Sequence, residues 1–426
     1  MATPFWYNAA LSVIKPVYQW RIKKRALNTE QLQQECLERF GPFQVPKNLH
    51  AIWFHVVSVG ETNAAQPLIE HYLKLGHPVL VTNTTKTGQA RAKSLFLKAP
   101  YLDLFQAVYL PADQKILIRE FYQKYQPKLL LLMETELWPN LLDQAPQFNV
   151  PSVLLNARLS EKSAKGYAKV KGLTRGMLKN LTGLLAQDTA TQQRYIQLGI
   201  AAEKTQVLGN IKFDITAPER FIHQADQLKQ EWQLGGRKIV TLASTHAPEE
   251  KEILSVLKAA LEADPYLVCI VVPRHPERFD EVFQAAQSLG LKIQRRSLGQ
   301  HIEADTQIYL ADSMGEMWLW YGLSQACYVG GSLNEPGGGH NILEPIALHV
   351  PTVLGKNYFN FQTIVDEFVQ ADAVKVVEDA EQAAAVLMIL LDDAEQANTL
   401  NQAAQKIMQL NTGSLKKHIQ VIDAYL

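Results

Sequence analysis

The sequence predicts an α/β protein of two domains, each with a parallel β-sheet covered by helices. A chain of 426 residues, 47% of them hydrophobic, is too long for one ordinary core. Short apolar runs alternate with helical segments, which is typical of βα units and a parallel sheet. The alternation restarts after Gly235 and Gly236, so the second half of the chain repeats the architecture of the first.

The strand-like runs define the two domains. In the first domain they lie at residues 50–57, 78–82, 129–133, 153–156 and 183–186, with helices such as 62–75 and 114–125 between them. In the second domain they lie at residues 238–243, 267–272, 307–310, 325–329, 352–354 and 373–377. We therefore expect a first domain at 49–210, a second at 211–400 and a C-terminal helix at 401–426. Two such domains facing each other across a cleft would build one site from both.

The N-terminal segment, 1–25, predicts a membrane-associated helix, which a linker helix at 26–48 follows. Residues 4–22 are apolar and aromatic, and basic residues cluster at 21–25. A spanning helix needs about 20 apolar residues, and Lys15 and Pro16 interrupt this run. Aromatic side chains beside a basic flank fit an interfacial helix on the cytoplasmic face of a membrane. A core helix or a partner-binding helix is the alternative.

The composition argues against several classes of protein. Lys and Arg number 42, as do Asp and Glu, so the zero net charge argues against non-specific nucleic-acid binding. The three cysteines are far apart in the chain, which fits a reducing compartment rather than a disulfide framework or a zinc knuckle. No HExxH motif and no Asp-x-Asp pair is present, so we expect no catalytic metal.

A glycine-rich stretch at 327–355 is the strongest local signal. A strand ending at Val329 is followed by GGS at 330–332, GGGHN at 337–341, a helix at about 342–349 and a second strand. Glycines beside a helix start predict backbone N–H groups that point at an anion. Glu344, in the first turn of that helix, could accept hydrogen bonds from a ribose diol. A plain glycine-rich turn with a capping Asn is the alternative.

Ser58 and Glu61 follow the first strand of the first domain and open a helix. The spacing S-x-x-E is also that of a capping box, in which both side chains satisfy backbone N–H groups. The carboxyl end of a strand is where open α/β sheets bind ligands, and a carboxylate there can act as a general base. Both interpretations stay open at this point.

Carboxylates also follow the strand at 129–133, in the run METELWPN. Glu134 and Glu136 lie on one side of the chain if this segment is extended. Two carboxylates after a buried strand are costly unless they are solvated or bound. The alternative is a helix N-terminus that favours acidic residues.

Three further turns carry polar side chains at strand ends or at the domain join. Lys212, in GNIKFD at 209–214, could neutralise a phosphate or a sugar carboxylate, or it is a surface lysine in a linker. Arg274, in PRHPER at 273–278, suits a phosphate or a carboxylate, or belongs to a turn fixed by prolines. Ser313, in DSMGEM at 312–317, could contact a nucleotide or simply cap a helix.

Taken together, these motifs resemble a known family. SVGE, METELWPN, GNIKFD, PRHPER, DSMGEM, GGSL and GGHNILEP occur in this order from residue 58 to 345. They are similar to those of the 3-deoxy-D-manno-octulosonic acid (Kdo) transferases of lipopolysaccharide synthesis, and the resemblance extends to the hydrophobic and basic N-terminus. The resemblance implies a GT-B fold with two Rossmann-like domains, and an inverting enzyme of the inner membrane. It also implies CMP-Kdo as donor, a lipid A precursor as acceptor, and neither cofactor nor metal.

The resemblance also implies roles for single residues. Glu61 matches the proposed catalytic base, and Glu134 matches a carboxylate needed near the acceptor or donor sugar. The residues assigned to donor binding are Lys212, Arg274, His275, Ser313, Gly315, Met317, Gly331, Ser332, Asn341 and Glu344.

Two other functions fit the same architecture. The first is an isomerase similar to the UDP-N-acetylglucosamine 2-epimerases, which also pair two such domains but lack a lipid-facing helix. The second is a membrane-bound sensor of sugar nucleotides that has no catalytic activity.

Overall fold

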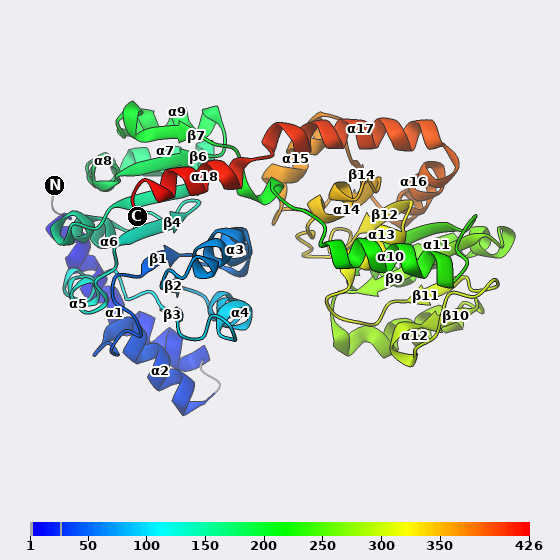
Figure 1. The fold of residues 1–426 in the computed structure, drawn as a ribbon, viewed down its shortest axis with the longest axis horizontal. Coiled ribbons are helices and arrows are strands. Elements are labelled where there is room, and N and C mark those ends of the chain that lie inside the picture. Colours follow the sequence, from blue (N-terminus) through cyan, green and yellow to red (C-terminus); the bar gives the residue numbers. More distant parts are fainter. Residues whose placement is uncertain (1–2, 26–27) are drawn as a thin grey trace. The chain divides into compact units, whose positions relative to one another are not determined.

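The computed structural model describes residues 3–25 and 28–426, which form two compact units (Figure 1). Unit 1 contains the chain up to Asp214 together with residues 411–426, and unit 2 contains residues 215–410. Residues 1–2 and 26–27, which belong to the predicted N-terminal helix and linker helix, lie outside the described residues.

Unit 1 is built on a sheet of seven parallel strands in the order β3-β2-β1-β4-β5-β6-β7. The strands are β1 (Ile52–His55), β2 (Val79–Asn83), β3 (Phe105–Tyr109), β4 (Leu129–Met133), β5 (Ser152–Ala157), β6 (Gly183–Ala186) and β7 (Thr205–Val207). Successive residues of β1 enter opposite cores, since Trp53 packs on one face of the sheet and Phe54 on the other. A sheet buried on both faces explains why its strands read as continuous apolar runs.

Helices cover both faces of this sheet (Figure 1). They are α1 (Phe5–Arg25), α2 (Thr29–Phe40), α3 (Val59–Lys74), α4 (Lys86–Phe96), α5 (Lys115–Tyr125), α6 (Pro139–Gln144), α7 (Glu161–Lys169), α8 (Lys171–Asn180), α9 (Thr189–Leu198) and α18 (Ser414–Asp423), with 3₁₀ turns at Ala145–Phe148, Ala202–Lys204 and Ile211–Phe213.

Unit 2 repeats the architecture with the strand order β10-β11-β9-β8-β12-β13-β14, again all parallel. The strands are β8 (Lys238–Thr245), β9 (Leu267–Pro273), β10 (Ile293–Arg295), β11 (Ile308–Leu310), β12 (Ala326–Val329), β13 (Thr352–Gly355) and β14 (Lys375–Val377). The helices are α10 (Glu219–Glu231), α11 (Glu249–Ala263), α12 (Phe279–Ser288), α13 (Met317–Leu323), α14 (Leu343–Ala347), α15 (Gln362–Gln370), α16 (Ala380–Asp392) and α17 (Ala394–Asn411), with 3₁₀ turns at Pro276–Arg278 and Arg296–Leu298.

The C-terminus departs from the predicted division. The sequence placed a boundary at 400/401, but α17 runs through that point without a break. The last helix, α18, instead belongs to unit 1. The Asp214 carboxylate accepts hydrogen bonds from the N–H groups of Gly413 (2.6 Å) and Leu415 (2.5 Å), and Tyr72 donates to Asp423 (2.9 Å). Asp214 thus holds the N-terminus of α18, where a negative charge is favourable.

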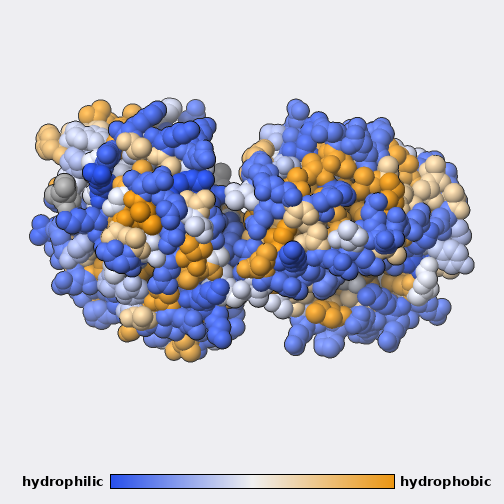
Figure 2. All heavy atoms as spheres, turned by 90° about the horizontal axis from the view of Figure 1, so that it is seen from above, coloured by the Kyte–Doolittle hydropathy of each residue, from blue (hydrophilic) through white to orange (hydrophobic). Residues whose placement is uncertain are grey.

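The N-terminal helix α1 lies on unit 1 and leaves much of its apolar surface exposed. Ile22 is its one fully buried residue, whereas Phe5, Val13 and Trp20 are 87%, 77% and 60% exposed. No helix within residues 3–25 and 28–426 is both long and apolar enough to cross a membrane. Elsewhere, the face shown in Figure 2 is mostly hydrophilic, with separate apolar patches on each unit.

Candidate functional site

In both sheets the strand order reverses beside the first strand, and ligands of doubly wound sheets bind outside the carboxyl ends of the strands at this position. In unit 1 the reversal lies between β1 and β4, which are paired. Ser58 and Glu61 come directly after β1, and Glu134 comes directly after β4. The two motifs, far apart in sequence, therefore meet at one edge of the sheet.

Glu61 combines a capping role with a perturbed carboxyl group. One of its oxygens accepts the Val57 N–H (2.8 Å) and the other accepts the Ser58 hydroxyl (3.2 Å), while Ser58 caps α3. Burial, with a further contribution from the charges of Glu136 and Glu134, raises the pKa of Glu61 to about 7 against the lowering effect of these hydrogen bonds. A carboxylate with a pKa near neutrality is suited to general-base catalysis.

Glu134 is a buried carboxylate held between two cations. Its side chain lies 2.7 Å from Arg158 Nε through one oxygen and 2.7 Å from Lys212 Nζ through the other. Its φ of 57° lies in the left-handed region, a strained conformation that concentrates at functional sites. Both oxygens are engaged by cations, so Glu134 orients Arg158 and Lys212.

The structure corrects two expectations about this region. The segment after β4 is a turn, not an extended strand, since Glu136 N–H donates to the Met133 carbonyl (3.3 Å) and Leu137 N–H to the Thr135 carbonyl (2.9 Å). Lys212, which the domain boundary at 210/211 assigned to the second domain with the donor residues, belongs to unit 1 and binds Glu134.

Glu136 extends the acidic cluster towards His55. Its Oε2 accepts the Trp138 indole N–H (2.8 Å) and lies 3.7 Å from His55 Nε2. His55 is fully buried and its Nδ1 lies 2.9 Å from the Thr82 hydroxyl, whereas its Nε2 has no hydrogen-bond partner among the described residues. The edge of unit 1 therefore brings together three carboxylates and two cations, a set that can remove a proton and hold an anionic group.

In unit 2 the reversal lies between β8 and β12, and a buried glutamate occupies it. Glu249, the first residue of α11, is 0% exposed. Its Oε1 accepts the N–H groups of Ser332 (2.9 Å) and Leu333 (2.8 Å) and the Tyr328 hydroxyl (2.7 Å). Its Oε2 accepts the N–H groups of Gly331 (2.8 Å) and His246 (2.9 Å).

These contacts correct the prediction for Gly331 and Ser332. The glycine-rich turn does surround an anion, but the anion is the Glu249 carboxylate, so these two N–H groups are not available to a substrate. The Ser332 hydroxyl is also used, since it donates to the Val329 carbonyl (2.7 Å) and accepts the Gly355 N–H (2.8 Å). A Cβ on Gly330 would lie 2.7 Å from Thr245 Cα, which explains the glycine beside β8.

Three histidines and an arginine lie at the same edge of unit 2. His246 and His340 approach through their Nε2 atoms at 2.9 Å, and the rings of His246 and His275 lie 5.0 Å apart. Burial, with smaller contributions from His246 and Arg274, lowers the pKa of His340 to about 4. Burial also lowers the pKa of His246. Arg274 is exposed at the end of β9.

The remaining donor-binding candidates lie in two turns of unit 2. Asn341 accepts the Leu343 N–H (3.1 Å) and donates to Glu344 (3.3 Å), and burial raises the pKa of Glu344. The helix predicted at 342–349 is the shorter α14.

The turn after β11 contains Ser313, Gly315 and Met317. Ser313 donates to Glu316, which Arg296 holds at 2.9 Å. Gly315 has a φ of 82°, and Met317 begins α13. Because β11 pairs with β9, this turn and Arg274 lie at neighbouring strand ends. The assignment of these residues to donor binding stays a prediction.

Arg158, His246 and Glu249 also belong to these two edges, although they were not among the residues predicted from the sequence. The signal for the last two was present, because the run THAPEE follows the first strand of unit 2 as SVGE follows the first strand of unit 1. Among the residues that the structure describes, no group of three or more His, Cys, Asp or Glu side chains is arranged to hold a metal ion.

Comparison with known proteins agrees with these motifs. The family model for "3-Deoxy-D-manno-octulosonic-acid transferase (kdotransferase)" matches residues 34–215. The 3-deoxy-D-manno-octulosonic acid transferase of Haemophilus influenzae is 35% identical over 99% of this chain and 98% of its own length. That of Bordetella pertussis is 33% identical over 99% of both chains.

Solved structures match as well. The C-terminal CMP-Kdo binding domain of WaaA from Acinetobacter baumannii is 60% identical, covering 45% of this chain and all of that domain, with a TM-score of 0.45. A glycosyltransferase from Rickettsia africae is 15% identical, and the match covers 89% of this chain and 99% of that protein with a TM-score of 0.52. The UDP-GlcNAc 2-epimerase of Neisseria meningitidis is 12% identical, and the match covers 86% of this chain and 100% of that protein with a TM-score of 0.53.

The last two similarities concern the fold alone and confirm the expected α/β class of GT-B proteins, with two Rossmann-like units in one chain. The sequence similarity is more specific, because it covers nearly the whole length of both curated relatives at more than 30% identity. The chain belongs to the family of 3-deoxy-D-manno-octulosonic acid transferases.

Proposed function

We propose that this protein transfers Kdo from CMP-Kdo to a lipid A precursor, with inversion at the anomeric carbon, at the cytoplasmic face of the inner membrane. Membership in the family supports Kdo transfer in lipopolysaccharide synthesis. The observation that carries the proposal is Glu61, a carboxylate with a pKa near 7 at the switch point of the unit 1 sheet. A general base at that position is what an acceptor hydroxyl requires.

In this mechanism Glu61 takes the proton of the acceptor hydroxyl. The hydroxyl oxygen then forms a bond to the anomeric carbon of Kdo. The bond between that carbon and the CMP phosphate breaks, and CMP leaves with the electron pair. Lys212 and Arg158, fixed by Glu134, supply positive charge beside the acidic cluster for an anionic group of a substrate.

Unit 2 supplies the donor site in this proposal. Arg274 and the neighbouring histidines offer a cationic group and N–H donors for the phosphate. Asn341 and Glu344 offer an amide and a carboxylate to the nucleoside. The charge that develops on the CMP leaving group would be stabilised by these fixed groups.

The direct test is CMP release from CMP-Kdo. We expect release that depends on a lipid A precursor. An epimerase-like isomerase would instead interconvert UDP-sugars without any acceptor, and a sensor would bind CMP-Kdo without releasing CMP. The epimerase similarity, at 12% identity, concerns the fold alone and gives this alternative no further support.

Replacing Glu344 by alanine should weaken CMP binding. A hydrogen bond to a charged group is worth about 1.5–3 kcal/mol, which corresponds to a loss of roughly 10- to 100-fold in affinity. Calorimetry with CMP measures the effect, and Glu367→Ala, on α15 of the same unit, serves as the control. Equal affinity of the parent protein and Glu344→Ala would remove Glu344 from the donor site.

Transfer should continue in the presence of a chelator. In our proposal, cationic side chains and N–H donors hold the CMP phosphate, so no divalent ion takes part. Initial rates with and without EDTA measure this directly. Loss of activity that one particular divalent ion restores would contradict the prediction.

Removing three charges of α1 should weaken binding to anionic membranes. Arg21, Lys23 and Lys24 are exposed, and each basic residue at such a surface contributes about 1 kcal/mol. We expect the triple Gln variant to co-sediment less with anionic vesicles at low salt, and the difference to shrink as salt screens the charges. The control variant replaces three lysines of α7 by glutamine, at Lys162, Lys165 and Lys169. Equal binding of all three proteins would favour a partner-binding role for α1.

A further inference from the structure

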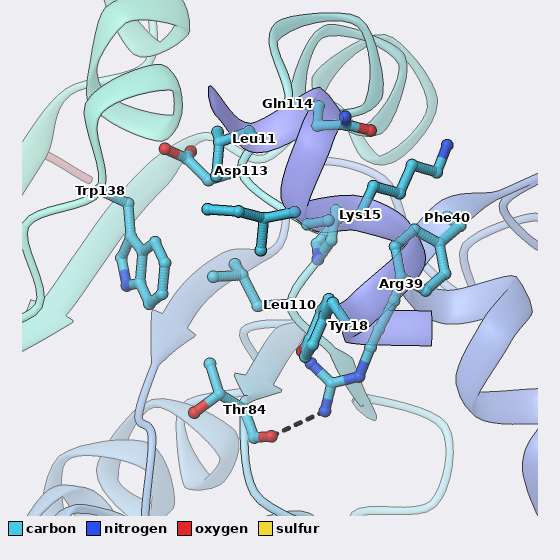
Figure 3. Close-up of a pocket in the computed structure, with 13 residues that line it drawn as sticks. Leu11, Lys15, Tyr18, Arg39, Phe40, Thr84, Leu110, Asp113, Gln114 and Trp138 are labelled. Carbon is cyan, nitrogen blue, oxygen red and sulfur yellow. Dashed lines mark hydrogen bonds between the residues drawn. The ribbon is translucent and has the colours of Figure 1, made fainter. Parts of the chain in front are cut away.

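Beneath α1, unit 1 contains an apolar pocket that the proposed reaction does not use. The pocket has a volume of about 280 Å³, close to the lower end of typical ligand sites at roughly 300–1,000 Å³. Its walls come from the middle of α1, the end of α2 and the segment that follows β3 (Figure 3). The lining includes Leu11, Ile14, Phe40, Leu110, Pro111 and Trp138.

The way α1 is attached explains why the pocket exists. Near its start, the Tyr7 hydroxyl donates to Asp113 (2.9 Å) and Asn8 accepts from Asn140 (3.0 Å). At its end, Arg25 pairs with Glu35 (2.7 Å). Between these two polar attachments the helix crosses the unit and leaves a hollow. An apolar ligand that fills this hollow would gain dispersion contacts with the apolar side chains of its walls.

The polar groups at the pocket suit a lipid with an anionic head. Arg39 is fully buried, and its guanidinium donates to the Thr84 carbonyl (2.7 Å; Figure 3). It also pairs with Glu35 (2.9 Å), so its charge is already compensated. Lys15 also lines the pocket, and its ammonium lies 5.5 Å from the centre of the Phe40 ring. This arrangement fits an aliphatic chain in the pocket and a phosphate beside Lys15.

The exposed face of α1 indicates where such a chain comes from. Ile14 belongs both to the pocket lining and to the exposed apolar side chains of the helix. Val13, Val17 and Trp20 on the same helix are 77%, 57% and 60% exposed. The pocket is thus continuous with the surface that we place against the membrane.

The pocket is connected to the acidic cluster of unit 1, which favours the lipid acceptor over bulk membrane lipid as the ligand of the pocket. Trp138 lines the pocket, and its indole N–H donates to Glu136 (2.8 Å). The charge of Glu136 in turn acts on the pKa of Glu61. A single side chain therefore separates the pocket from the cluster that contains the proposed base.

We propose that this pocket binds one acyl chain of the lipid acceptor and so positions the acceptor's sugar headgroup at Glu61. The inference rests on the proposed function, because it assumes a lipid acceptor. It assigns to Leu11, Ile14 and Leu110 a role in recognising the acyl part of that acceptor.

Photo-labelling tests the proposal without requiring turnover. The probe is a tetra-acylated lipid A precursor with a diazirine in one acyl chain, and labelled peptides are identified by mass spectrometry. We expect labels on the peptides that contain residues 11–18 and 110–114. Leu11→Trp, which fills the pocket, should reduce this labelling at least tenfold. Val13→Trp makes a similar change on the exposed face of the same helix and should leave it unchanged.

Ala112→Leu fills the pocket from the opposite wall. It provides a second pocket-filling variant in case Leu11→Trp does not fold. It should also reduce labelling, and both filled variants should raise KM for the acylated acceptor with little change in kcat. Labels outside the pocket, or labelling that Leu11→Trp and Ala112→Leu leave unchanged, would overturn the inference. Equal labelling by a phospholipid that carries the same diazirine chain would also overturn it, because the pocket would then take bulk lipid.

Different results would contradict the proposed reaction and the acyl-chain pocket. Labelling of the pocket by the acceptor, without any Kdo transfer by the parent protein, would contradict the proposed function and support the pocket. Kdo transfer with labels elsewhere would contradict the pocket alone.

Discussion

Replacing Glu61 by glutamine should lower the turnover of Kdo transfer by about 10²–10⁴-fold, the usual contribution of a general base. The substitution keeps the size of the side chain and one carbonyl oxygen that can accept the Val57 N–H, so α3 should keep its start. Turnover is measured as acceptor-dependent CMP release, and folding by thermal unfolding. Glu70→Gln, which removes a half-buried carboxylate that pairs with Lys74 on the same helix, should change neither.

The pH profile provides a second test of the same residue. Glu61 acts as a base only when it is deprotonated, and its pKa is raised to about 7. kcat/KM should therefore rise about tenfold per pH unit below pH 7 and level off above it, and Glu61→Gln should lose this rise. If the variant unfolds early while its folded fraction stays fully active, Glu61 is a capping residue only.

Replacing Glu249 by glutamine should destabilise unit 2. Glu249 accepts four backbone N–H groups and the Tyr328 hydroxyl, and an amide offers these donors one oxygen in place of two. An unsatisfied buried donor costs about 1–3 kcal/mol, so we expect the free energy of unfolding to fall by about 2–4 kcal/mol. CMP affinity should fall as well, because the turn at 330–333 and His246 share this carboxylate.

Chemical denaturation with and without CMP measures the effect, since a ligand of the folded state shifts the unfolding of the unit that binds it. Glu252→Gln, an exposed substitution on the same helix, is the control. A stability of Glu249→Gln equal to that of the parent protein would show that the N–H groups of the glycine-rich turn find other partners.

Much of the fold could be predicted because buried strands leave a clear pattern. Residues 129–133 and 183–186 are apolar throughout and coincide with β4 and β6. The edge strands β3, β7 and β10 were missed. β7 and β10 have three residues each and little buried surface, whereas β3 has five residues that are mostly buried. The C-terminal domain boundary could not be predicted from the neighbouring sequence. The helix α18 is attached to unit 1 by Asp214, which lies about 200 positions earlier in the chain.

The sequence predicted candidate polar residues at strand ends but not the partners that these residues contact. Motifs that follow strands predicted Glu61, Glu134 and Glu344 as polar groups at the carboxyl edges of the two sheets. The partner of the glycine-rich turn, Glu249, lies 82 residues before Gly331, and that of Lys212 lies 78 residues away at Glu134. Such pairings depend on which strands lie side by side, and no local spacing encodes this.

The most direct test of the account is the mass and stereochemistry of the lipid product. The protein is incubated with CMP-Kdo and a tetra-acylated lipid A precursor, and the lipid is analysed by mass spectrometry and NMR. We expect a lipid heavier by one or more Kdo residues, with inverted configuration at each new anomeric carbon and one CMP released per Kdo. A lipid of unchanged mass, or a Kdo linkage with retained configuration, would contradict it.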